Sequence, residues 1–387
     1  MTSKSRRGHG EGSVYEFKPG LWAASVDLGW IDGKRRRKVG YAPTEAEAIR
    51  KRDELRRALQ LGVNLAAPPR TVGEWLVEWL GDKANEGRTK LTTIARYRQV
   101  IQVHLIPQLG RKKLDKLSPR DVQHMVTALR DRLSAGSVVK VHAVLRVALG
   151  DAQRLDLVER NVAKSAKLPS IGRSERRALA PAEARKLLAE VAGNRLEAFF
   201  VLALTTGLRR GELLGLRWSD VDSDARVLFV RQTLQRVGGE LQIVAPKTHR
   251  STRAVPLAQL ACDALARHRE LQDKEKVAVE ELWRDSGLVF ANTLGGPMEP
   301  RNVNRRFELV RKAAGLEWLR LHDLRHAFAT FLLHDGQELR TVMDLLGHST
   351  IRLTADTYGH VLPSKARDAA KGIDRIMDGD KSEEEDQ

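Results

Sequence analysis

Cysteine is nearly absent from this chain, which has a single one, Cys262, among 387 residues. One cysteine excludes an internal disulfide and any zinc cluster built from several thiolates. Cys262 stands in the short segment Leu-Ala-Cys-Asp-Ala-Leu, residues 260–265. We therefore expect it to be buried as a small hydrophobic side chain.

Long apolar runs are absent as well. No stretch approaches the roughly 18 apolar residues of a membrane-spanning helix, and the first seven residues are polar and basic where a signal peptide would have an apolar core. We therefore expect a soluble, cytoplasmic protein.

Two kinds of motif found in many phosphoryl-transfer enzymes are also absent from the sequence. The sequence has no G-x-x-x-x-G-K-[ST] loop for a nucleotide, and no cluster of carboxylates outside its C-terminal tail that could hold metal ions. Neither a metal ion nor another cofactor is expected in the chemistry.

Positive charge, in contrast, is abundant. The chain carries 67 lysines and arginines against 50 acidic residues, a net charge of +17, and its isoelectric point is near 10.1. This balance favours a polyanionic partner, although charge alone does not separate DNA from RNA or an anionic membrane. The length indicates two or three domains.

Residues 1–63 are expected to form a small module of three strands and one helix. The β-like runs are residues 13–17, 22–28 and 34–39, and the turn dipeptides Pro19-Gly20 and Asp32-Gly33 separate them. A capping-box pattern from Thr44 to Glu47 then opens a helix that ends near Gly62.

The third strand of this module is strongly basic. Its charged residues are Lys34, Arg35, Arg36, Arg37 and Lys38. One interpretation is a solvated edge strand that charge protects from aggregation. We favour a sheet that lies against DNA, because a β-ribbon fits the major groove and these charges would meet phosphates.

Residues 64–70 contain a pair of prolines and are expected to be a linker. Residues 71–166 then have the periodicity of a helical domain, with capping signals at Thr71 and Ser118. The apolar positions at helical spacing include Val72, Trp75, Leu76, Trp79, Ile94, Tyr97, Ile101, Leu105, Val122, Met125, Val126, Leu129, Leu133, Val141, Val144, Leu145, Ala148 and Leu149. Candidate phosphate contacts on the polar faces are Arg96, Arg98 and Lys140.

A second linker, residues 167–177, is short, polar and basic. Residues 178–377 are expected to be mainly helical, with strand-like runs at 227–234, 241–245 and 253–257 and a turn at Gly238-Gly239. Residues 378–387 form an acidic tail that is expected to be disordered.

The chemistry-bearing residues of this last domain form an ordered series. Arg209 follows Thr206-Gly207-Leu208, His322 and Arg325 lie in His-Asp-Leu-Arg-His, His348 follows Leu346-Gly347, and Tyr358 comes last. The series resembles the tyrosine recombinase (phage integrase) family over most of the chain. The segments around residues 104–122 are similar to the core-binding domain of that family, and residues 1–63 look like its arm-binding domain.

These residue types suit an attack on a DNA phosphodiester. In-line phosphoryl transfer needs a nucleophile, neutralisation of the non-bridging oxygens and a proton for the leaving oxygen. Two arginines can grip phosphate oxygens in place of metal ions, since a guanidinium is a planar fork that keeps its charge.

Gly207 should break one helix so that Arg209 starts the next, with Glu212 close enough to brace its guanidinium. His322 and Arg325, three apart, should share one helix face, whereas His326 is expected to be structural.

The resemblance assigns further roles. Arg209 and Arg325 would clamp the phosphate, His322 would accept the tyrosine proton or bond a phosphate oxygen, His348 would donate another hydrogen bond, and Tyr358 would be the nucleophile. Lys247 is implied as the acid that protonates the departing 5′-oxygen. Only four tyrosines occur, and the other three lie in the expected DNA-gripping domains.

The resemblance also implies the wider function. It indicates a multidomain, mainly α protein with small β elements: an N-terminal three-stranded sheet plus helix, a helical core-binding domain and a mixed α/β catalytic domain. It implies an integrase of a phage or integrative element that recombines DNA through a 3′-phosphotyrosine and acts as a homotetramer on core and arm sites in the bacterial cytoplasm, at the nucleoid. A host DNA-bending protein and a directionality factor are possible partners.

Two alternatives of other classes remain at this point. A type IB topoisomerase would share the phosphotyrosine chemistry without site preference, and the arm-like module disfavours it. A DNA-binding regulator on the same scaffold would lack activity, and the complete series of six catalytic candidates disfavours it. Beyond Tyr358, an apolar stripe over residues 366–377 is expected to dock on a neighbouring protomer or on its own domain.

Overall fold

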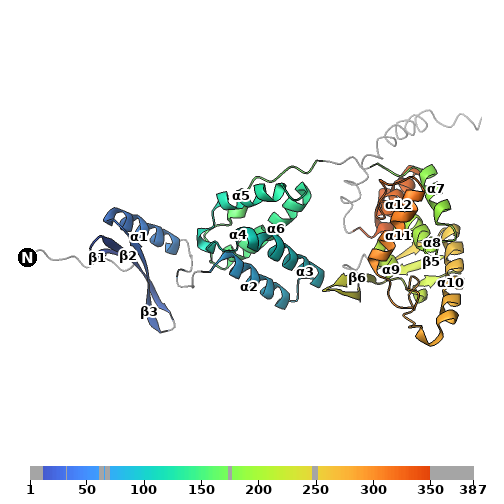
Figure 1. Ribbon diagram of the computed structural model, residues 1–387, viewed down its shortest axis with the longest axis horizontal. Coiled ribbons are helices and arrows are strands. Elements are labelled where there is room, and N and C mark those ends of the chain that lie inside the picture. The colour runs from blue at the N-terminus through green and yellow to red at the C-terminus, as the bar shows by residue number, and fades with distance from the viewer. Residues whose placement is uncertain are drawn as a thin grey trace, which may run out of the picture. The chain divides into compact units, whose positions relative to one another are not determined.

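The computed structural model describes residues 12–31, 33–60, 65, 70–172, 177–245 and 252–348 (Figure 1). The chain divides into two compact units, Met1–Ser174 and Glu175–Gln387, and this boundary falls within the predicted linker 167–177. Among the residues described, no helix is long and apolar enough to cross a membrane.

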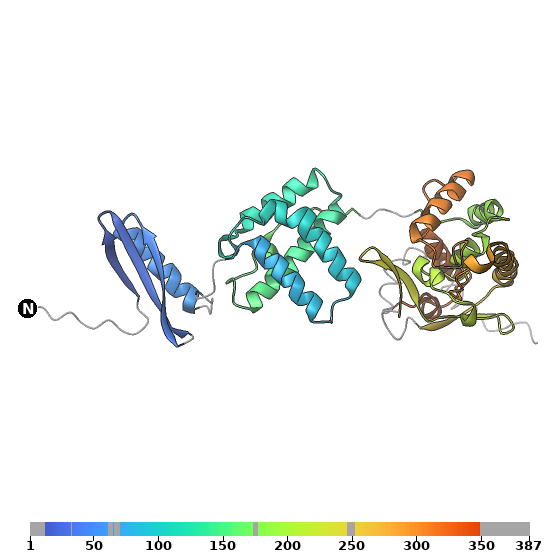
Figure 2. The same ribbon diagram turned by 60° about the horizontal axis from the view of Figure 1, so that its bottom comes forward.

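The N-terminal part of the first unit is an antiparallel sheet of β1 (Ser13–Lys18), β2 (Leu21–Ile31) and β3 (Lys34–Ala42), in that order, with α1 (Glu45–Gln60) packed on one face (Figure 2). The turns use Gly20 and Gly33 at positive φ, a conformation that costs glycine little. The three predicted strands are confirmed and are longer than expected. The core here is small and is built on Ala24, Ala42 and Ala48.

The rest of the first unit is a bundle of α2 (Val72–Asn85), α3 (Leu91–Val100), α4 (Ile106–Leu109), α5 (Pro119–Arg130) and α6 (Ala135–Arg154). Full capping boxes open α2 at Thr71 and α5 at Ser118, as predicted. The predicted apolar stripes meet in one core, with Tyr97 and Leu133 at its edge. The division of this unit into residues 1–63 and 71–166 remains a prediction, which the two separate cores support.

One irregularity in the bundle was not anticipated. Residues Ile101–Leu105, between α3 and α4, form a π-helical turn in which the backbone N–H of Ile106 bonds the carbonyl of Ile101. Pro107 follows directly and has no N–H to give to an ordinary helical bond. The extra residue in the turn lets the chain continue in helical form past the proline.

The second unit contains α7 (Pro181–Val191), α8 (Glu197–Thr205), α9 (Arg210–Leu214), α10 (Gln259–Val279), α11 (Pro300–Ala313), α12 (Asp323–His334) and α13 (Leu339–Leu346). Its strands are β4 (Val221–Asp222), β5 (Val227–Val230), β6 (Thr233–Val237), β7 (Glu240–Val244) and β8 (Arg253–Pro256). Helix α8 runs through the core, and each of its residues from Ala198 to Leu204 is buried.

The strand run predicted over residues 227–234 is wrong as a single element. It is two strands in different sheets, since β5 belongs to the sheet β4-β5-β8 and β6 pairs only with β7. Arg231 and Gln232 separate them, and their side chains bond Asp220 and the carbonyl of Gly215. The predicted turn at Gly238-Gly239 is present between β6 and β7. Cys262, which was expected to be buried, is only half-buried and packs at the edge of the core.

Candidate active site

The turn between α8 and α9 carries the first predicted catalytic arginine. Helix α8 ends at Thr205, Gly207 has a φ of +62°, and Arg209 is the N-cap of α9. A Cβ on Gly207 would lie 2.5 Å from Cδ1 of Phe328, so both its backbone angle and its surroundings require glycine. The helix break and the helix start predicted from the sequence are confirmed.

Glu212 braces Arg209, as the spacing predicted. Its Oε1 lies 2.7 Å from Nη1 of Arg209, and its Oε2 accepts the Arg209 backbone N–H at 3.0 Å. Glu212 is buried, and burial alone would raise the pKa of its carboxyl. The positive charges of Arg253 and Arg209 outweigh this effect and hold that pKa below its ordinary value. A buried, ionised carboxylate therefore fixes one side of the Arg209 guanidinium.

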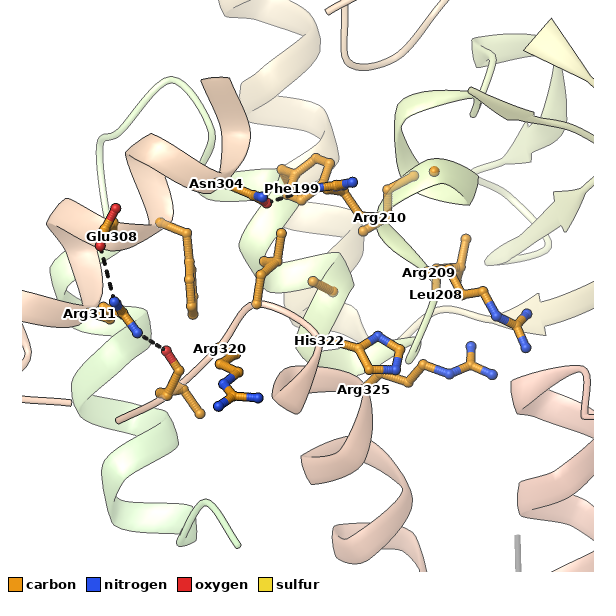
Figure 3. Close-up of a pocket in the computed structure, with 16 residues that line it drawn as sticks. Phe199, Leu208, Arg209, Arg210, Asn304, Glu308, Arg311, Arg320, His322 and Arg325 are labelled. Atoms are coloured by element: carbon orange, nitrogen blue, oxygen red, sulfur yellow. Dashed lines mark hydrogen bonds and ion pairs between the residues drawn. The ribbon is translucent and has the colours of Figure 1, made fainter. Parts of the chain in front are cut away.

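His322 and Arg325 come from the start of α12 and line the same pocket as Arg209 (Figure 3). The pocket has a volume of about 560 Å³. His322 is the N-cap of α12 and is exposed, whereas Arg325 is only 3% exposed. The structure thus brings Arg209 together with two side chains that lie more than a hundred residues further along the chain.

The Arg325 guanidinium is fastened at two points. Nη1 donates to the carbonyl of Gly207 and Nη2 to the carbonyl of Leu346, each at 2.6 Å. Because a guanidinium is planar, bonds from two of its nitrogens fix the plane of the group beside the pocket. His326, which sequence reasoning had set apart from the site, packs edge to face on His322 with ring centroids 5.1 Å apart.

His348 follows the end of α13. Gly347 has a left-handed φ of +64°, and the His348 backbone N–H bonds the carbonyl of Met343. The imidazole is buried, which together with the charges of Arg325, Arg209 and Arg253 lowers its pKa to about 4. With this pKa, His348 is neutral near pH 7 and can donate one ring N–H.

Arg253, at the start of β8, was missed by the sequence reasoning. Its side chain is 7% exposed and its Nη2 lies 2.9 Å from Oε2 of Glu212. A signal was present in the sequence. The strand-like run predicted over residues 253–257 has apolar residues at the alternate positions 255 and 257. Both are buried, so Arg253 shares their inward face and needs a partner there.

Several predicted residues lie outside the described part of the chain. Lys247 falls between β7 and β8, and Tyr358, the stripe over residues 366–377 and the acidic tail all follow residue 348. Of the predicted DNA contacts, Lys34, Arg35, Arg36, Arg37, Arg96, Arg98 and Lys140 are exposed, and Lys38 is partly exposed. Arg35 also donates from Nε to Oδ2 of Asp27 at 2.7 Å.

Within the described residues, no group of three or more His, Cys, Asp or Glu side chains is placed to hold a metal ion. The side chains that line the pocket include the guanidinium groups of Arg209 and Arg325.

Comparison with known proteins identifies the class. Residues 177–365 match the model of the phage integrase family, and residues 71–130 match the phage integrase N-terminal SAM-like domain. An integrase of Streptomyces ambofaciens is 32% identical over 369 residues, which cover 91% of this chain and 93% of that protein. The ICEBs1 integrase of Bacillus subtilis is 26% identical over 94% of this chain and the whole of its own length.

The fold agrees with these matches. A solved structure of residues 82–397 of the Tn1549 transposon integrase, in complex with a circular intermediate DNA, superposes with a TM-score of 0.67 at 21% identity, over 79% of this chain and 99% of that one.

These family matches show a tyrosine-type site-specific recombinase, an enzyme that cleaves and religates DNA. The chain belongs to the phage integrase family.

Proposed function

We propose that this recombinase is the integrase of a phage or other integrative element and that Tyr358 is its nucleophile. The observation that carries the site assignment is the convergence of Arg209, His322 and Arg325 on one pocket. The imidazole of His348 is buried, and burial together with the charges of these arginines lowers its pKa. The names of relatives from an integrative element and a transposon support the biological role.

In the proposed reaction, Arg209 and Arg325 each bond non-bridging oxygens of the scissile phosphate and offset the charge that develops there. The phenol oxygen of Tyr358 forms a bond to phosphorus while the bond to the 5′-oxygen breaks, and His322 takes the phenol proton. Lys247 gives a proton to the departing 5′-oxygen. The product is a 3′-phosphotyrosine, which a 5′-hydroxyl of another strand reverses without an external energy source.

Neutral His348 fits this scheme as a hydrogen-bond donor. A cationic imidazole beside two guanidiniums would be repelled before the phosphate binds, whereas a neutral one donates its N–H to a phosphate oxygen at no such cost. Binding of the anionic phosphate between the arginines would offset their charge and bring the pKa of His348 back toward its ordinary value.

The remaining parts of the chain are proposed to hold DNA. The three-domain division assigns residues 1–63 to arm sites, residues 71–166 to the core site and residues 178–377 to catalysis, with linkers at 64–70 and 167–177. The exposed basic side chains of β3 support arm binding. We further propose a homotetramer that joins two duplexes in the bacterial cytoplasm at the nucleoid, aided by a host DNA-bending protein and a directionality factor.

The proposal is tested by trapping the covalent intermediate. A nicked duplex taken from the DNA that flanks the gene is incubated with the wild type, with Tyr358→Phe and with Tyr15→Phe as a matched control. We expect a slow-migrating band in denaturing gels with the wild type and the control, and none with Tyr358→Phe, which should still bind DNA. An undiminished band with Tyr358→Phe rules out this nucleophile, and equal cleavage of random duplexes points to a topoisomerase.

A further inference from the structure

Two arginines hold consecutive carbonyl oxygens at the C-terminal end of α13. Nε of Arg253 donates to the carbonyl of Leu345 at 2.7 Å, and Nη2 of Arg325 donates to the carbonyl of Leu346 at 2.6 Å. The last carbonyls of a helix have no partner within the helix and carry its negative dipole end, so cations satisfy both needs there. Gly347 and His348 follow directly.

Arg253 also bonds the carboxylate that braces Arg209. Its Nη2 lies 2.9 Å from Oε2 of Glu212, while Oε1 of the same carboxylate lies 2.7 Å from Nη1 of Arg209. The Arg253 and Glu212 side chains are 7% and 8% exposed. In this geometry a single guanidinium bonds both the brace of Arg209 and the helix end that precedes His348.

The chemistry of the pair explains why an arginine is needed. Glu212 is buried, and without a nearby cation burial would favour its protonated form. A protonated Glu212 would lose much of its attraction for Arg209. A lysine at position 253 could supply charge, but it lacks the planar fork that reaches a carboxylate and a backbone carbonyl from two nitrogens.

The packing around Arg253 is tight as well. A Cβ on Gly347 would lie 2.8 Å from Nη1 of Arg253, so the left-handed residue that ends α13 rests directly on this guanidinium. Movement of Arg253 would therefore act on both Glu212 and the Gly347-His348 turn.

We propose that Arg253 is a positioning residue for strand cleavage, which bonds the Glu212 carboxylate, fixes the direction of the Arg209 guanidinium and sets the end of α13 from which His348 reaches the phosphate. This inference rests on the proposed function, because it concerns the same phosphate site. Arg253 acts through Glu212, Arg209 and His348, and it does not itself contact the substrate.

The test compares Arg253→Gln and Arg253→Lys with Arg195→Gln. Arg195 is a matched control in the same unit, because it also bonds a carboxylate, that of Glu275 at 2.7 Å, and a backbone carbonyl, that of Ala291 at 3.0 Å. Full-length proteins are assayed for DNA affinity, for the rate of covalent adduct formation at saturating protein, and for melting temperature.

We expect Arg253→Gln to slow adduct formation by roughly 10-fold or more, because misdirected catalytic groups lose most of their rate advantage. Its DNA affinity should change by no more than about twofold, which separates positioning from binding. Arg253→Lys should recover part of the rate, and Arg195→Gln should lower the melting temperature without slowing cleavage to a similar extent.

A second variant, Glu212→Gln, keeps the inference falsifiable if Arg253→Gln fails to fold. On the Glu212→Gln background, replacement of Arg253 by Lys should slow cleavage much less than it does in the wild type, because the shared partner is already gone. Equal effects on both backgrounds overturn the inference, as does cleavage by Arg253→Gln at the wild-type rate. Failure of the proposed function is distinguishable, since the wild type itself would then form no adduct.

Discussion

Nη1 of Arg325 lies 2.6 Å from the carbonyl oxygen of Gly207, although 118 residues separate the two in the chain. The second predicted catalytic arginine is thus fastened to the turn that presents the first, Arg209. Because Gly207 adopts a left-handed backbone conformation against Phe328, the position of both arginines depends on a residue without a side chain.

Replacing Gly207 by alanine should destabilise the catalytic unit and impair cleavage together. The left-handed backbone alone costs roughly 1–3 kcal/mol for a residue with a Cβ, and the contact with Phe328 adds to it. Urea denaturation and adduct formation measure the two effects. Gly81→Ala is the control, since a Cβ there meets nothing within 4 Å and helix α2 should gain slightly. Wild-type stability of Gly207→Ala would contradict the argument.

Arg325→Ala should slow cleavage by roughly 10²-fold or more, the scale on which a preorganised donor to a developing charge acts. Binding of DNA should fall far less. The variant should also be less stable, because the carbonyls of Gly207 and Leu346 lose their donor in a buried place. The DNA affinity is measured by gel shift and the cleavage rate by single-turnover kinetics. If the affinity and the cleavage rate fell by the same factor, Arg325 would be a binding contact only.

The pH dependence of stability should carry a contribution from His348. Its pKa is lowered from 6.5 to about 4 in the folded protein, so between these values the unfolded chain binds more protons. Folding stability from this group is therefore fully present above pH 6.5 and is lost as the pH falls toward 4. Melting temperatures of the wild type should drop more steeply across this range than those of His348→Gln. Parallel curves for the two proteins would exclude the effect.

The exposed basic strand β3 should set arm-site affinity without affecting chemistry at the core site. Arg36→Gln combined with Arg37→Gln should weaken arm-site binding and reduce the salt dependence of binding by about one unit for each phosphate that is no longer neutralised. Footprints and core-site adduct formation are measured in parallel. Arg50→Gln, on the exposed face of α1, is the control, and an equal loss from it would show a general charge effect.

Cleavage should continue in the presence of a metal chelator, because guanidinium groups rather than metal ions offset the phosphate charge in the proposed reaction. Adduct formation is compared with and without chelator and after addition of Mg²⁺. Loss with the chelator and recovery with Mg²⁺ would contradict the proposed roles of Arg209 and Arg325.

The sequence by itself determined the local elements and the class of chemistry. Capping boxes at Thr71 and Ser118, the glycine break before Arg209 and the apolar stripes of the helical bundle were readable because caps, turns and periodicity act over a few neighbouring residues. The series from Arg209 to Tyr358 resembles that of the tyrosine recombinases, and its residue types suit the attack of a phenol on a phosphodiester.

Tertiary structure alone decided which distant groups meet. The run at residues 227–234 has the residue types of one strand, but its two halves pair in different sheets, and between them the side chains of Arg231 and Gln232 bond Asp220 and the carbonyl of Gly215. Arg253 reaches Glu212 across 41 residues. Burial, together with the charges of three arginines, lowers the pKa of His348. Such pairings depend on how packed elements approach one another in a medium of low polarity. Short-range sequence patterns do not determine that approach.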